Sequence, residues 1–281
     1  MDYQYILTEE RDRVLHLTLN RPERRNALSQ GLLKELFTAL QDGEADDGVG
    51  CIVIKGAGSS FCSGLDYGDV LPEEEASSEK AEPTPLDVFL STLRSSDPWA
   101  LLWNLTKPVI AQVHGYCIAG ANELALNCDV VIIAEDAQIG YPPVRATGSS
   151  PSHMWTYLVG PQWAKRMMLT GDPIDGKTAE RIGLVLKAVP ADKLEEEVLT
   201  LAGRIANIPL ELLAPHKALI NKVMGLMGHA VAQQMAFDTV AITHHSDARR
   251  KFNELAEKEG LRAALQHRDG PFGDYTARPR K

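Results

Sequence analysis

The sequence predicts an α/β fold with a mostly parallel sheet, followed by a helical C-terminal region. Short apolar runs of strand length alternate with segments of helical period as far as about residue 190. Strands that are apolar along their whole length are typical of sheets covered by helices on both faces. Beyond about Asp192 the strand pattern stops. We therefore expect an α/β core over residues 1–195 and a helical region over residues 196–281.

The first elements follow from changes of period. Leucines alternate with polar residues over 13–20, which predicts a strand buried on one side. Helical spacing then predicts a helix that Ser29 caps and that ends near Gly43. The apolar run 51–54 predicts a buried strand that leads into a turn rich in glycine and serine.

A second round of strand, helix and strand is expected at residues 109–113, 121–127 and 130–134. The acidic, proline-rich segment 71–85 has no apolar period and predicts a surface excursion. Further helices are expected at residues 192–207, 210–226, 229–244 and 247–267. Since no strand pattern accompanies these helices, their apolar stripes must be buried on one another, on the core or on another subunit.

Composition excludes several classes of function. The 281 residues include 29 Lys and Arg and 38 Asp and Glu, which gives a net charge of −9. This negative charge argues against nucleic-acid binding. The longest apolar run, at 130–134, is far short of the ~20 residues that span a bilayer, and no signal peptide is visible. The four cysteines lack metal-binding spacing. We expect reduced thiols, a cytoplasmic location, no membrane contact and no bound metal or cofactor.

Three segments are rich in small residues and turn formers, at 60–66, 114–125 and 139–145. Small residues allow a sharp bend that leaves backbone N–H groups pointing into a cavity. Taken alone, the first segment also fits an ordinary strand-to-helix turn, and Glu123 in the second fits a surface acid in the first turn of a helix. In a buried setting, Glu123 would instead have a raised pKa and could act as an acid or base.

Together the motifs resemble the crotonase superfamily, the enoyl-CoA hydratase/isomerase family. The pattern R-P-x-x-x-N-A-L falls at 21–28, and x-F-x-x-G-x-D falls at 60–66. The segment K-P-V-I-A at 107–111 leads to Gly-Ala-Asn-Glu-Leu-Ala at 120–125. The landmarks L-T-G and G-L-V follow at 169–171 and 183–185. Each motif is weak alone, but their order over about residues 5–270 makes the resemblance specific.

This resemblance implies a spiral of β-β-α units with C-terminal helices that mediate trimerisation, as a homotrimer or a dimer of trimers. It implies an acyl-CoA thioester as the substrate. The backbone N–H groups of Ser63 and Gly120 would polarise the thioester carbonyl, and Glu123 would act as the acid or base. Arg24, Arg25 and Ala27 would contact the CoA moiety. The other positions expected to contact the substrate are Leu65, Asp66, Tyr141, Pro143, Arg145 and His153.

One departure from the family pattern concerns the reaction itself. Hydratases of the best-known type carry a second glutamate, and its position here is Pro143, which holds no proton. Groups near this position that could supply a proton or a hydrogen bond are Asp66, Tyr67, Tyr141, Arg145 and His153. We expect a lyase that adds water to a 2-enoyl-CoA with an atypical second acid/base position. The alternatives are a double-bond isomerase, a crotonase-type hydrolase, or an acyl-CoA-binding protein without catalysis.

Overall fold

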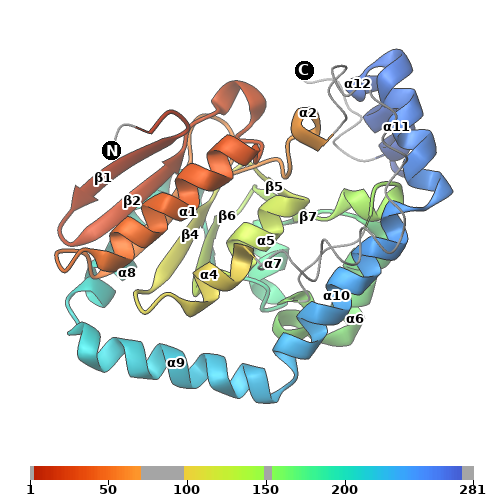
Figure 1. The fold of residues 1–281 in the computed structure, drawn as a ribbon. Coiled ribbons are helices and arrows are strands. Elements are labelled where there is room, and N and C mark those ends of the chain that lie inside the picture. Colours follow the sequence, from red (N-terminus) through yellow and green to blue (C-terminus); the bar gives the residue numbers. More distant parts are fainter. Residues whose placement is uncertain (1–2, 71–97, 149–153, 274–281) are drawn as a thin grey trace, which may run out of the picture.

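The computed structural model describes residues 3–70, 98–148 and 154–273, and in these the strands form two sheets (Figure 1). The larger sheet has six strands in the order β1-β2-β3-β4-β6-β9, all parallel except for β1. Their bounds are β1 (Ile6–Arg11), β2 (Val14–Leu19), β3 (Cys51–Gly56), β4 (Val109–Val113), β6 (Val130–Ala134) and β9 (Lys187–Val189). The smaller sheet contains β5 (Tyr116–Ile118), β7 (Gln138–Gly140) and β8 (Ile174–Asp175).

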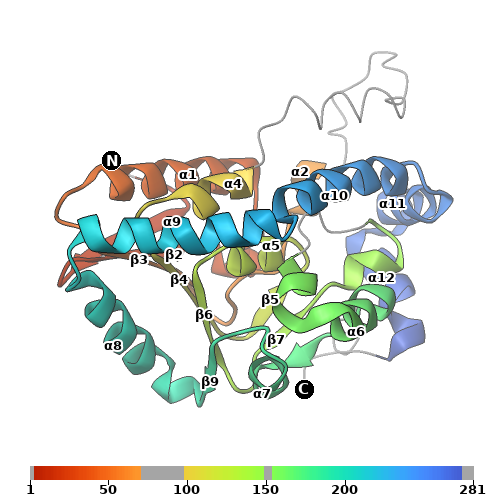
Figure 2. The ribbon, with the colours of Figure 1, turned by 90° about the horizontal axis from the view of Figure 1, so that it is seen from below.

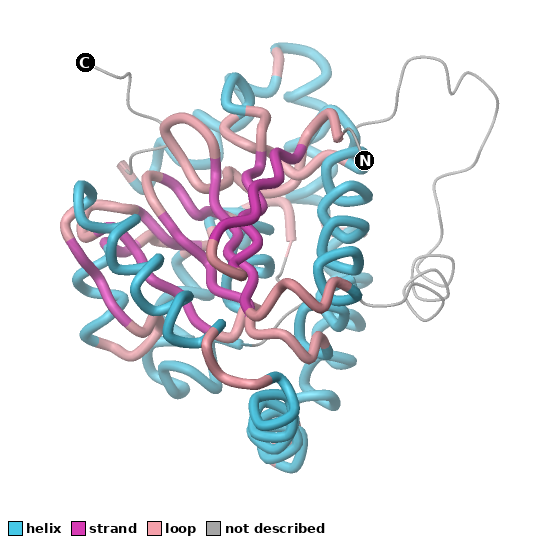
Figure 3. Tube along the Cα trace, turned by 90° about the vertical axis from the view of Figure 1, so that its left-hand side faces the viewer, coloured by secondary structure: helices cyan, strands magenta, loops and turns pink. Residues whose placement is uncertain are grey.

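The large sheet is the centre of the core, and the strands lie together between helices in Figure 3. Every residue of β4 is buried, and so are the first four residues of β3, as expected of strands with helices on both faces. β4 and β6 have the predicted bounds, and the parallel pairing is confirmed. The edge strand β1 and the small sheet escaped prediction because β1 exposes all but its first residue and the other three strands have only two or three residues.

Helices cover both faces of the large sheet (Figure 2). α1 (Gln30–Ala45) begins at the predicted cap, where the Ser29 hydroxyl accepts a hydrogen bond from the Leu32 N–H at 3.2 Å. α8 (Leu194–Ala206) lies on the opposite face and buries Val198, Ala202 and Ala206 against the core. The sheet therefore does lie beneath the first helix beyond Asp192, contrary to expectation, because the four-residue spacing of these small side chains forms a flat stripe suited to a sheet.

The remaining elements before α8 connect the two sheets and surround their ends. They are η1 (Pro22–Arg24), α2 (Tyr67–Val70), α4 (Pro98–Asn104), α5 (Gly120–Leu126), η2 (Pro142–Arg145), α6 (Met154–Thr170), α7 (Gly176–Arg181) and η3 (Ala191–Lys193). α6 is bent at Gly160, which precedes Pro161. All four cysteines of the chain are buried and unpaired, as the sequence predicted.

The C-terminal helices run along the lower edge and the right-hand side of the molecule in Figure 1. α9 (Leu210–Leu226) and α10 (His229–His244) have the predicted bounds. The helix predicted over 247–267 is two helices, α11 (Asp247–Glu259) and α12 (Leu261–Asp269), followed by η4 (Gly270–Phe272). The break falls at Gly260, whose φ of 89° is outside the helical range and favours glycine.

Among the described helices, none is long and apolar enough by itself to cross a membrane. Residues Ala191–Ala206 and Leu210–Leu226 meet the length and composition requirement only as a pair, bent by 109°.

Candidate active site

Three chain segments lie side by side at the ends of the sheets and form the backbone of the site. The Cys62 N–H donates to the Tyr116 carbonyl at 2.9 Å, and the Ile118 N–H donates to the Cys62 carbonyl at 3.2 Å. On the other side of this loop, the Leu28 N–H donates to the Gly64 carbonyl at 2.8 Å. The two bridges follow a parallel β pattern. The loop after β3 is therefore held on both sides by ladder hydrogen bonds.

The side chain of Asn26 holds the segment at 21–28 against the loop after β3 through hydrogen bonds. Its side chain is fully buried, and its Oδ1 accepts a hydrogen bond from the Arg21 N–H at 2.9 Å. Its Nδ2 lies 2.9, 2.8 and 3.2 Å from the carbonyl oxygens of Ala57, Ser60 and Phe61, respectively. A short amide side chain that both accepts and donates joins two loops whose backbone groups would otherwise be buried without partners. This explains the asparagine in the motif at 21–28.

Two backbone donors at this place, those of Leu65 and Gly120, lie close together. Neither N–H has an acceptor within the described residues. A Cβ placed on Gly120 would lie 3.4 Å from the Leu65 nitrogen, so the two groups are close neighbours. By contrast, the Ser63 N–H donates to the Arg25 carbonyl at 3.0 Å. The prediction of a Ser63 donor is therefore corrected, because its N–H is already used within the loop, whereas the N–H of Leu65 points to the other side of the bridged segment.

Ala119 turns the chain so that the Gly120 N–H is exposed to the site. Its φ of 58° and ψ of −128° are unusual for a residue with a Cβ. The Ala119 N–H donates to the Gly140 carbonyl at 3.0 Å. The Asn122 amide donates to the carbonyl oxygens of Ala119 and Gly140 at 2.9 and 2.7 Å. These contacts hold a strained turn in place, as is often found where a backbone group has a function.

Glu123 lies in the first turn of α5, three residues after Gly120, and is only 2% exposed. Burial raises the pKa of the Tyr141 phenol well above its usual value. The charge of Glu123 raises this pKa further, and Tyr67 makes a smaller contribution in the same direction. Glu123 and Tyr67 therefore act on the same buried phenol. A carboxylate in this setting has the chemical means to take up and return a proton beside the two backbone donors.

A cavity of about 420 Å³ opens beside these groups. Of the predicted site residues, those in its lining are Arg24, Arg25, Ala27, Ser63, Leu65, Asp66 and Pro143. Its other lining residues are Glu23, Tyr67, Tyr116, Ile118, Ala119, Leu261, Leu265 and Arg268. Gly120, Glu123 and Tyr141 are not among the lining residues, but Gly120 directly follows the lining residue Ala119. His153 lies outside the described residues.

The cationic groups of the cavity come from two parts of the chain, the adjacent Arg24 and Arg25 and, on α12, Arg268. Arg24 and Arg25 are exposed, and the Arg25 guanidinium lies 5.5 Å from the centre of the Tyr116 ring. Asp66 uses both carboxylate oxygens locally, because it forms a 2.8 Å ion pair with Arg21 and accepts the Gly68 N–H at 3.0 Å. Asp66 thus shapes the loop that carries Leu65. The two exposed arginines remain available for an anionic ligand.

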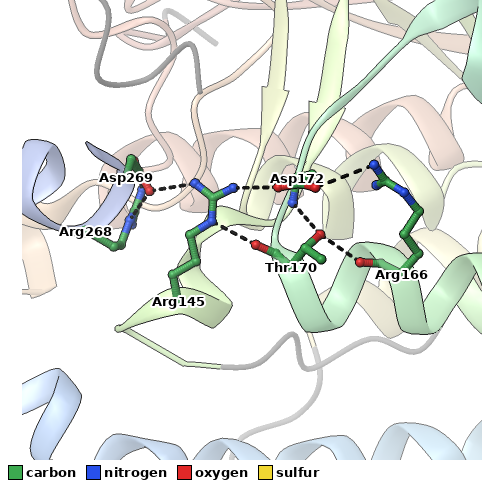
Figure 4. A network of polar contacts seen from close by, with 6 residues as sticks. All are labelled: Arg145, Arg166, Thr170, Asp172, Arg268 and Asp269. Carbon is green, nitrogen blue, oxygen red and sulfur yellow. Dashed lines mark hydrogen bonds and ion pairs between the residues drawn. The ribbon is translucent and has the colours of Figure 1, made fainter. Parts of the chain in front are cut away.

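Arg145 does not contact the cavity, which corrects its prediction as a substrate-binding residue. Its side chain is 2% exposed and forms ion pairs with Asp172 and Asp269, both at 3.1 Å (Figure 4). Its Nε donates to the Thr170 carbonyl at 2.9 Å. Arg268 also binds Asp269, through two hydrogen bonds of 2.8 Å. Arg145 therefore joins η2 to the end of α12, and its charge is neutralised by these acids.

The contribution of α12 was missed by the sequence analysis. Leu261, Leu265 and Arg268 line the cavity, and their i, i+4, i+7 spacing places them on one face of this helix. The glycine at 260, inside an otherwise helical pattern, was the signal that could have separated α12 from α11. The C-terminal region therefore contributes to the site as well as to the expected assembly.

Comparisons with known proteins agree with this arrangement. The profile of the family described as enoyl-CoA hydratase/isomerase matches residues 9–274. A Rhizobium meliloti protein named a probable enoyl-CoA hydratase is 33% identical over 279 residues, which cover 97% of this chain and 99% of that protein. The 2,3-dehydroadipyl-CoA hydratase of Escherichia coli is 31% identical over 274 residues, covering 95% and 98%. An enoyl-CoA hydratase structure from Mycobacterium smegmatis superposes with a TM-score of 0.88 at 33% identity, covering 97% and 96%.

The fold and the site define a protein with paired backbone donors beside a buried carboxylate. Similarity over nearly the whole length, in sequence and in structure, then gives the relationship. The chain belongs to the enoyl-CoA hydratase/isomerase family and has the crotonase fold, as the motifs predicted.

Proposed function

We propose that this protein adds water to the double bond of a 2-enoyl-CoA. The observation that supports the proposal is the pair of unbonded N–H groups of Leu65 and Gly120 beside the buried carboxylate of Glu123. Relatives named as a probable enoyl-CoA hydratase and as a 2,3-dehydroadipyl-CoA hydratase support the same reaction. The reaction needs no metal or organic cofactor in this proposal, since backbone donors and one carboxylate supply its chemistry.

The reaction places negative charge on the thioester oxygen. When water attacks Cβ, the electron pair of the double bond moves toward the carbonyl and forms an enolate. Two fixed N–H donors stabilise that oxyanion, and donors of this kind contribute roughly 3–4 kcal/mol each in comparable sites. Glu123 takes a proton from the water and returns a proton to Cα.

CoA recognition would use the local cationic groups rather than the overall charge. The net charge of −9 repels a polyanionic thioester, so phosphate binding requires a basic patch. Arg24 and Arg25 are exposed at the cavity, and their guanidinium groups suit phosphate in charge and in geometry.

A double-bond isomerase is the second candidate, and one observation favours it. Pro143 lines the cavity where a second acid or base would be expected, and a single carboxylate is sufficient to move a proton between two carbons. Turnover in water labelled with heavy oxygen separates the two reactions, because hydration incorporates the label and isomerisation does not.

The substitution Glu123→Gln tests the mechanism. It keeps the size of the side chain and removes its ability to carry a proton, so kcat for a reactive enoyl-CoA should fall at least about 10²-fold. Glu10→Gln is the matched control, since Glu10 is an exposed residue of β1. A Glu123→Gln variant with the rate of the wild type would contradict the proposal.

For its assembly and location, we propose a homo-oligomer, a trimer or a dimer of trimers, that works in the cytoplasm. The apolar side chains exposed along α9 and α10 support self-association, and four unpaired cysteines suit a reducing compartment.

A further inference from the structure

Hydration requires a group that holds the attacking water, and the cavity wall at Pro143 offers no side-chain donor or acceptor. Several polar side chains of the lining have other commitments. Asp66 is bound by Arg21 and by the Gly68 N–H. The Ser63 hydroxyl donates to the Arg24 carbonyl at 3.4 Å. Tyr67 lines the same cavity, and its hydroxyl is joined through the Thr147 hydroxyl to the Pro143 carbonyl, at the position that lacks the second acid.

The hydrogen bonds around Tyr67 fix the direction of its own proton. Its hydroxyl lies 3.2 Å from Thr147 Oγ1, and either oxygen could donate across this distance. The Thr147 hydroxyl, however, donates its single proton to the Pro143 carbonyl at 3.4 Å. The proton between the two residues must therefore come from Tyr67.

Arg268 supplies a second contact to the same phenol. Its Nη1 donates to the Tyr67 oxygen at 3.4 Å, while the remainder of its guanidinium is bound to Asp269. A phenol oxygen can donate one hydrogen bond and accept two. With Thr147 as its acceptor and Arg268 as one donor, the Tyr67 oxygen retains one position that can accept a hydrogen bond.

We propose that Tyr67 is a water-positioning residue that accepts a hydrogen bond from the water added to Cβ. The inference rests on the proposed hydratase function and identifies the side chain that takes the place of a second carboxylate. Because its own proton is directed to Thr147, Tyr67 orients the water and does not transfer a proton itself. The centroid of its ring lies 5.6 Å from the ring centroid of Phe252 on α11, and this packing fixes the phenol in position.

The proposed step conserves atoms and charge. The water donates one hydrogen bond to Tyr67, and its other proton passes to Glu123 as the bond between its oxygen and Cβ forms. The π electrons of the double bond move to the thioester oxygen, where Leu65 and Gly120 donate their N–H groups. Glu123 then returns the proton to Cα, so the product gains one water and the enzyme is unchanged.

The test compares two reactions of the same variant. The first is hydration of crotonyl-CoA, which requires water at Cβ. The second is exchange of the Cα hydrogens of butyryl-CoA with deuterium oxide, which requires the carboxylate and the two N–H donors but no water at Cβ. Tyr67→Phe should lower kcat for hydration by about 10²-fold with little change in KM, and it should leave exchange within about twofold of wild type.

Controls separate the hydroxyl of Tyr67 from general effects of substitution. Tyr3→Phe removes a hydroxyl that binds Asp42 far from the cavity, and both reactions should stay at the wild-type rate. Thr147→Val should slow hydration, whereas Thr147→Ser should restore it, because serine retains the acceptor for the Tyr67 proton.

Each result separates the inference from the proposed function. Hydration by Tyr67→Phe at the wild-type rate overturns the inference and leaves the proposed function intact. An equal fall in hydration and exchange overturns it too, because Tyr67 would then only shape the loop. A wild-type protein that exchanges Cα hydrogens but hydrates no 2-enoyl-CoA overturns the proposed function, and with it the role of Tyr67.

Discussion

At the scale of single residues, Ala119 shows how the site is held under strain. Its positive φ is a conformation that glycine adopts without cost, while a residue with a Cβ loses on the order of 1–3 kcal/mol. The hydrogen bonds of Ala119 and Asn122 to Gly140 offset this cost. The Gly120 N–H therefore faces the site because its neighbours, and not its own residue type, fix the turn.

Replacing Ala119 with glycine should stabilise the protein. Relief of strain exceeds the extra entropy of glycine in the unfolded chain, and a net gain of about 1 kcal/mol would raise Tm by roughly 2–4 °C. Thermal unfolding followed by circular dichroism measures the change. Ala121→Gly is the control, because Ala121 is a buried helical residue and its replacement should lower Tm. Equal falls in the two variants would show that Ala119 is unstrained.

Individual site residues differ in how well the sequence motifs locate them. Of the expected site residues, Arg24 and Arg25 line the cavity, and Gly120 and Glu123 lie in the first turn of α5. The donor in the first loop was misplaced at Ser63, because the direction of an N–H depends on which neighbouring segment bridges the loop. That pairing joins residues far apart in the chain, and no local pattern reveals it.

At the scale of elements, α12 is tied to the site by a buried charge network. Asp269 is fully buried and binds both Arg145 and Arg268 (Figure 4). Burial is the largest single influence on Arg268 and lowers its pKa, but the hydrogen bonds and charges of Asp269 and Tyr67 together raise that pKa above the usual value. The position of the cavity residues of α12 thus depends on one carboxylate.

Asp269→Asn should therefore destabilise the protein by about 3 kcal/mol, since two buried guanidinium groups lose their shared counter-charge. It should also raise KM for the acyl-CoA, because Leu261, Leu265 and Arg268 line the cavity. Urea denaturation and steady-state kinetics measure the two effects. Asp247→Asn removes one partner of an exposed pair with Arg250 and should change stability by no more than about 0.5 kcal/mol. Similar losses in both variants would exclude a special role for the buried network.

Elements with a long, regular pattern were predicted well. The bounds of β4, β6, α9 and α10 match the expectation to the residue. Prediction failed where tertiary contacts decide the structure: at the very short strands, at the break at Gly260, and at α8, whose small side chains gave no sign that a sheet lies beneath them.

At the scale of the whole molecule, α9 and α10 expose an apolar surface that a single chain leaves in water. Leu226 is 90% exposed, and it is accompanied by other large side chains on these two helices. They are Leu212, Leu219, Ile220, Val223, Val231, Met235 and Ile242, with Met227 between the helices. Apolar side chains gathered on adjoining helices favour contact with a second copy of the chain.

Leu226→Glu should lower the mass of the assembly in solution, because a charge would be buried in the subunit contact. Size-exclusion chromatography with light scattering measures this mass. Leu7→Glu serves as the control, since Leu7 is half exposed on the edge strand β1, away from these helices. Detection of a monomer for the wild-type protein, or an unchanged mass for Leu226→Glu, would contradict self-association through this surface.

The bridges that hold the segments around Cys62 have a consequence for how the protein can change. The groups proposed to stabilise the enolate are main-chain atoms, so most amino-acid replacements at the same positions leave them in place. Side chains of the cavity wall, such as Pro143, can vary without loss of those donors. Such a scaffold can keep the backbone donors that stabilise an enolate while the side chains of the cavity wall are replaced. Replacement of those side chains can then change how the enolate reacts.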